Sequence, residues 1–199
     1  PHGGKQVHVM SVLMRENLND WVRIAEFALE RNLAGVRFTA FHDAYFSQNP
    51  SSTGSAYSEP AFLAAAEAEI EKLIELKRRT GIIKNSEEYL RRVADYYRAP
   101  TGYFPVPCLQ GSNRIEVDVY GNVTLCSFMT DSLGNLLKQD MEEIWKSEQH
   151  RRAREAAFSG NCPKCFLSCY GEENLRLSAQ GFVSTFGDSV RRGMRLLRA

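Results

Sequence analysis

The distribution of cysteine is the feature that most constrains what this chain can fold into. All five cysteines lie between residues 108 and 169 of a 199-residue sequence, and none lies outside that window. Cysteines placed independently would seldom cluster so tightly, so we infer one shared role. The first residues lack the basic-then-apolar layout of a secretory signal, and in a reducing compartment clustered cysteines are more often metal ligands or catalytic groups than disulfides. The pattern predicts a metal site in a cytoplasmic protein.

The spacing separates the cysteines into a pair, Cys108 and Cys126, and a later run, Cys162-x2-Cys165-x3-Cys169. Between the members of the pair, residues 114–120 alternate between apolar and polar types, and Gly121-Asn122 turns the chain. This pattern predicts a half-buried β-hairpin that brings the two thiols together. In the later run, two residues between thiols allow a tight turn in which both sulfurs face one ion or cluster.

Spacing alone leaves three chemistries open. A [4Fe–4S] cluster takes four thiolates, zinc takes four ligands in a tetrahedron, and Cys-x2-Cys is also the spacing of a redox dithiol. Redox dithiols usually open a helix that follows a strand. Here the run follows a predicted helix over about 141–158 and a Gly160-Asn161 turn, which argues against a redox dithiol.

The residues before the cysteine window predict an α/β unit. Residues 6–13 and 36–41 are rich in β-forming side chains, and apolar residues recur at helical spacing between them, after a cap at Asn17 or Asn19. Strand, helix and strand in quick succession form a βαβ unit with a parallel strand pair. Further predicted elements are a helix from Pro60 to about Arg78, a short strand at 82–83, a helix capped by Asn85 or Ser86, and a domain boundary at 99–102.

Composition argues against two kinds of partner. The formal net charge is +1, so no global field draws the chain to nucleic acid or to a membrane surface. No apolar run approaches the roughly eighteen residues of a membrane span. Hydrophobic residues make up 43% of the chain and charged residues 25%, which is sufficient for a packed core. We expect neither a nucleic-acid partner nor a membrane span.

The cysteine window resembles a SPASM domain, the auxiliary-cluster domain at the C-terminus of many radical S-adenosylmethionine enzymes. The likeness rests on Cys108-x12-Gly121-x4-Cys126, on Leu133-Gly134-Asn135-Leu136, on Met141-Glu142-Glu143-Ile144-Trp145-Lys146-Ser147 and on the run ending at Cys169. The residues before Cys108 resemble the second half of the family's barrel. The resemblance implies an α/β fold, the second half of a partial (β/α)6 TIM-like barrel followed by a small β-hairpin-plus-helix iron–sulfur domain.

The resemblance also implies a division of the chain and its ligands. The half barrel would occupy residues 1–100, the SPASM-like domain 101–175, and a basic helical tail 176–199. One auxiliary [4Fe–4S] cluster is expected, because five cysteines cannot supply two complete cubes. The expected metal ligands are Cys108 and Cys126 with two of the remaining three, among Cys162, Cys165 and Cys169. The parent enzyme would use S-adenosylmethionine, with Ser11 as a contact to the cofactor ribose.

The signature Cys-x3-Cys-x2-Cys loop that holds the family's catalytic cluster does not occur in this sequence. The resemblance places that loop upstream of Pro1. We therefore expect a C-terminal fragment, inactive by itself, of an oxidoreductase that modifies peptides or assembles cofactors from a peptide or small-molecule substrate. The half barrel would leave an open strand edge, through which we expect dimerisation. The alternative is a non-catalytic, zinc-stapled module that binds a protein or peptide.

Overall fold

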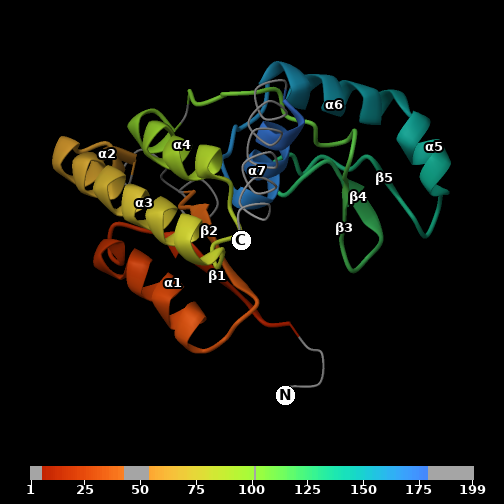
Figure 1. Cartoon of the computed structure of the whole chain (residues 1–199). Helices are drawn as coiled ribbons and strands as arrows, with labels where there is room; N and C mark the ends of the chain where they lie inside the picture. Colours follow the sequence, from red (N-terminus) through yellow and green to blue (C-terminus); the bar gives the residue numbers. More distant parts are fainter. Residues whose placement is uncertain (1–5, 43–53, 101, 179–199) are drawn as a thin grey trace. The chain divides into compact units, whose positions relative to one another are not determined.

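The computed structural model describes residues 6–42, 54–100 and 102–178 (Figure 1). Its helices are η1 (Leu18–Asp20), α1 (Trp21–Glu30), α2 (Gly54–Tyr57), α3 (Pro60–Thr80), α4 (Glu87–Arg98), α5 (Met141–Lys146), α6 (Glu148–Ser159) and α7 (Ser168–Leu177). Its strands are β1 (His8–Leu13), β2 (Gly35–Ala40), β3 (Glu116–Val117), β4 (Asn122–Thr124) and β5 (Gly134–Asn135). No helix within these ranges is both long and apolar enough to cross a membrane.

The chain divides into two compact units. Unit 1 consists of residues 1–103 together with 165–199, and unit 2 consists of Phe104–Lys164. The domain boundaries predicted from the sequence stay predictions. The predicted basic tail falls almost wholly outside the described residues, which end at 178.

The sheet of unit 1 confirms the predicted βαβ unit. β1 and β2 pair in parallel from His8 opposite Gly35 to Leu13 opposite Ala40, and α1 lies between them in the chain. The short third strand expected at residues 82–83 is a single parallel bridge between Ile83 and Val36. The described part of unit 1 is therefore α/β with a small parallel sheet, and the partial barrel stays a prediction.

The outer edge of β2 is paired mostly by side chains. The Val36 N–H donates to the carbonyl of Ile82, at 3.0 Å. Further along, the Asn85 amide makes both hydrogen bonds to Phe38, accepting from its N–H at 2.7 Å and donating to its carbonyl at 2.9 Å. The Ala40 N–H donates to the Tyr89 hydroxyl at 3.1 Å. Because buried backbone groups need partners, these side chains take the place of a neighbouring strand.

Helices α3 and α4 pack against each other in unit 1 and bury apolar and aromatic side chains. Ser86 caps α4 as predicted, its hydroxyl accepting the Tyr89 N–H at 3.0 Å. The rings of Tyr57, Tyr97 and Phe62 pack within 5.8 Å of one another, centroid to centroid. Aromatic rings bury large apolar areas, so this cluster contributes much of the hydrophobic stabilisation of unit 1.

Unit 2 contains the predicted hairpin, extended by one strand. β3 and β4 pair antiparallel, and β5 pairs antiparallel with β4, giving the order β3-β4-β5. Gly121 takes the left-handed conformation at the turn, with φ of +79°, which favours glycine there. The core beneath the strands is small, and its buried members are Val123, Leu125, Leu133, Ile144 and Ala157.

One expectation about helices was wrong, and another was right only in part. The helix predicted over 141–158 is interrupted at Ser147, which has extended backbone angles and whose hydroxyl caps α6 at the His150 N–H, 3.1 Å away. The side chain of a serine competes with the helical backbone for hydrogen bonds, so it suits a cap better than a helix interior. Asn17 is the N-cap residue of η1, which runs directly into α1, but its side chain makes no capping hydrogen bond, and α1 itself has Asp20 at its N-cap. The Asn17 side chain instead accepts the indole N–H of Trp21 at 2.7 Å.

Candidate metal centre

Three of the five cysteines belong to unit 2. Cys126 lies two residues after β4, the returning strand of the hairpin, and is 8% exposed, and Cys108 is partly buried against the unit's core. Cys162 is partly buried and follows Gly160, which ends α6 in the left-handed conformation. Burial is the largest cause that raises the pKa of Cys126 and of Cys162, and the Cys108 thiol raises both to a smaller degree. The hairpin and the end of α6 thus contribute three of the five cysteines to unit 2, from segments far apart in the sequence.

The turn after Cys126 directs backbone donors at its sulfur. Burial raises the pKa of the Cys126 thiol, and Cys108 and Glu116 act in the same direction. The N–H groups of Phe128 and Met129 oppose this effect by hydrogen bonding to the sulfur. Hydrogen bonds to a thiolate favour the charged form, which is the form that binds metal. The turn therefore holds a buried sulfur together with donors suited to its deprotonated state.

The turn after Cys162 has a similar arrangement. Burial raises the pKa of the Cys162 thiol, while the backbone N–H and the ammonium of Lys164 oppose that effect. Lys164 has φ of +56°, an uncommon left-handed conformation for a residue other than glycine. Such conformations cost free energy and are concentrated at functional sites. Two separate turns of unit 2 thus present N–H groups to cysteine sulfurs.

The other two cysteines belong to unit 1. Cys165 is partly buried, and Cys169 is exposed as the second residue of α7. In the described part of the chain no disulfide joins any two of the five cysteines. Among these described residues, no group of three or more histidine, cysteine, aspartate or glutamate side chains converges closely enough to hold a metal ion. The five predicted ligands therefore stay a prediction.

The donor chemistry nevertheless fits an iron–sulfur cluster. Such clusters are held by cysteine thiolates, and hydrogen bonds to the sulfurs set their potentials. Unit 2 supplies three thiols and N–H donors to two of them.

His150 is a buried polar residue that the sequence did not indicate. It is 1% exposed, and its Nδ1 lies 2.7 Å from the carbonyl oxygen of Trp145, so Nδ1 is the protonated nitrogen. Its Nε2 has no partner among the described residues, and neither does the amide of Gln110, which is also 1% exposed. Spacing among the four histidines could not reveal this residue, because its environment depends on the fold of unit 2.

The segment that contains all five cysteines matches a known protein family. Residues 108–170 match the model of SPASM, an iron-sulfur cluster-binding domain. This segment is a SPASM domain. The match begins at Cys108 and includes all five cysteines, and it extends across the boundary at residue 164 into unit 1. No curated protein and no solved structure matches the chain.

The SPASM domain confirms the family resemblance and implies iron–sulfur cluster binding. It is consistent with the C-terminal SPASM portion of a radical S-adenosylmethionine enzyme. Ser11 lies outside the matched residues, partly buried in β1 opposite Phe38. Its contact with a cofactor ribose stays a prediction.

Proposed function

We propose that this chain binds one auxiliary [4Fe–4S] cluster and forms the C-terminal part of a radical S-adenosylmethionine oxidoreductase. The observation that carries the proposal is the match of residues 108–170 to the SPASM iron–sulfur domain. It is supported by the presence of Cys108, Cys126 and Cys162 in unit 2, with backbone donors to the last two. A bound cluster supplies one-electron transfer. The chain's own residues hold the thiolates, satisfy their charge with N–H groups and shield the Cys126 sulfur from water.

The fourth thiolate comes from Cys165 or Cys169 in this proposal. Cys165 follows Cys162 by three residues, so the backbone allows the two at most about 11 Å of separation. Cys169 follows by seven residues, a looser limit. A cube takes four thiolates, so one cysteine is left over.

The remaining features of the parent enzyme belong to the same proposal. Its substrate is a peptide or a small molecule, S-adenosylmethionine binds in the barrel, with Ser11 as a candidate contact, and the chain works in the cytoplasm. The catalytic loop is supplied by residues outside this sequence, so the chain alone performs no radical chemistry. Among the described strands β1 pairs only with β2, so β1 is the edge we propose for dimerisation.

Anaerobic reconstitution with iron and sulfide tests the cluster. We expect about four irons per chain and a broad absorption band near roughly 400 nm. Cys126→Ala should lose most of the iron, whereas Ser127→Ala, its neighbour in the same turn, should retain it. Comparing Cys165→Ala with Cys169→Ala identifies the fourth ligand as the one whose removal lowers the iron content.

Two results would contradict the proposal. One zinc per chain without colour would assign the chain to zinc-stapled modules that bind proteins or peptides. If Cys126→Ala left the iron content unchanged, Cys126 of the hairpin would not be a cluster ligand.

A further inference from the structure

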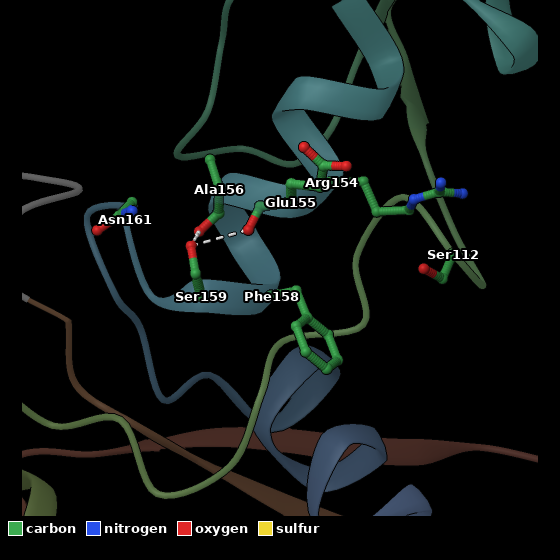
Figure 2. Close-up of a pocket in the computed structure, with 7 residues that line it drawn as sticks. All are labelled: Ser112, Arg154, Glu155, Ala156, Phe158, Ser159 and Asn161. Carbon is green, nitrogen blue, oxygen red and sulfur yellow. Dashed lines mark hydrogen bonds between the residues drawn. The ribbon is translucent and has the colours of Figure 1, made fainter. Parts of the chain in front are cut away.

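A groove runs along the C-terminal half of α6, entirely within unit 2 (Figure 2). Its volume is about 550 Å³, within the range of sites that take small ligands. The residues that line it are Ser112, Arg154, Glu155, Ala156, Phe158, Ser159 and Asn161. The groove thus combines one cation, one aromatic ring and several small polar side chains.

Arg154 differs from the other arginines of α6. Arg151 and Arg152 both form ion pairs with Glu148, and Arg151 also binds Glu155 at 2.6 Å. Arg154 is partly buried and has no hydrogen bond or ion pair with any residue that the structure describes. In Figure 2 its side chain extends from the helix on the side where Ser112 lies. A partly buried guanidinium that no described residue binds is suited to a carboxylate ligand. It can bind the carboxylate through two parallel N–H donors.

The other lining residues indicate what accompanies that carboxylate. Phe158 is 54% exposed, and its ring presents an apolar wall. The Ser159 hydroxyl donates to the Glu155 carbonyl at 2.8 Å, so it already has a partner within the helix. Glu155, the only acid in the lining, is held by Arg151. A ligand therefore meets an unneutralised cation beside an exposed ring, and not a balanced ion pair.

We propose that this groove binds an acidic peptide segment, with a carboxylate on Arg154 and an apolar side chain on Phe158. Charge complementarity favours a peptide with glutamate or aspartate over a neutral one. The groove is also close in the chain to two candidate cluster ligands, since Asn161 precedes Cys162 and Ser112 follows Cys108 by four residues. That the bound segment is the substrate of the cluster enzyme rests on the proposed function, whereas the binding itself does not.

Fluorescence anisotropy with two labelled octapeptides tests the groove in the full chain, with and without reconstituted iron. One peptide alternates Glu and Leu, and the other has Gln in place of Glu. We expect the acidic peptide to bind at least about tenfold more tightly, because hydrogen bonds between charged groups are the stronger ones. Arg154→Ala should weaken its binding by about tenfold or more, and Arg154→Lys by less, since lysine keeps the charge without the planar fork.

Arg152→Ala is the matched control, because it removes the same charge from the same helix at a side chain that is 75% exposed and paired with Glu148. Its affinity should stay within about twofold of the wild type. Phe158→Ala gives a second test should Arg154→Ala unfold, which thermal unfolding will reveal, and it too should weaken binding. Equal affinity for the two peptides, absence of binding, or equal losses in Arg152→Ala and Arg154→Ala would overturn the proposal. Iron content, measured on the same samples, separates this failure from failure of the cluster.

Discussion

Unit 1 and unit 2 bury very different amounts of apolar surface. Unit 1 packs long helices on a parallel sheet and buries large side chains such as Trp21, Phe38 and Tyr97 completely or almost completely. Unit 2 spans residues 104–164 and gathers five buried hydrophobic side chains in one cluster, one of them an alanine. Its strands are two or three residues long.

The difference has a physical consequence. Domains of about 60 residues bury a smaller fraction of their surface than larger ones, and small folds commonly need a metal or a disulfide for stability. No disulfide forms among the cysteines in the described residues. We therefore expect the hydrophobic core to stabilise unit 1, and the proposed cluster to contribute to the stability of unit 2.

The largest expected effect is the response of the two units to cluster removal. Hydrogen exchange should be slow in residues 35–100 with or without the cluster, whereas protection in residues 104–164 should fall by about 100-fold or more on chelation, because metal binding free energy is folding free energy in such domains. Mass spectrometry of peptic fragments measures this. Ser127→Ala should behave like the wild type. Equal protection of unit 2 in both states would show that its core suffices.

A smaller effect is expected from Asn85→Ala in unit 1. The substitution leaves the N–H and carbonyl of Phe38 without the amide that binds them both. Burying two unsatisfied backbone groups should lower the free energy of unfolding by about 3 kcal/mol. Urea unfolding followed by Trp21 fluorescence, in a Trp145→Phe background that silences unit 2, measures the loss.

Asn19→Ala is the control for that substitution, because Asn19 is exposed in η1 of the same unit. It should change the free energy of unfolding by less than about 0.5 kcal/mol. If Asn85→Ala also changed the free energy of unfolding by less than this amount, another group would have to form hydrogen bonds to the Phe38 backbone in its place.

The smallest expected effect is on how the stability of unit 1 depends on pH. The hydrogen bond from Arg78, with further help from Arg91, holds the pKa of Glu87 below its ordinary value of 4.5, against the opposing effect of partial burial. A depressed pKa gives stability that is present above pH 4.5 and is lost as pH falls through the lower folded value. Glu87→Gln should therefore destabilise unit 1 by less than about 1 kcal/mol at pH 7, with the difference from wild type vanishing in acid.

The same Trp21 measurement at several pH values checks this prediction. In unit 2 the exposed Glu148 has a pKa of about 2, lowered by Arg151 and Arg152. Glu148→Gln should have no effect on the Trp21 transition at any pH. A difference at Glu87 that persists below its folded pKa would point to packing instead of charge.

The sequence by itself predicted the features that depend only on residues close together in the chain. The βαβ pattern, the Gly121 turn, the Ser86 cap and the clustering of cysteine all depend on local periodicity or on the conformational preferences of single residues. The SPASM resemblance also followed from spacing, and the family match over residues 108–170 confirmed it.

Only the tertiary structure decided features that join distant residues. Asn85 completes β2 from 47 residues away, and α7, with no side-chain hydrogen bond at its N-cap, gave no signal in the sequence. That Arg154 has no partner among the described residues likewise depends on where every acid of unit 2 lies. Local pattern specifies an element and its ends, but the partners of a buried amide, a thiol or a guanidinium are set by packing, which local pattern does not encode.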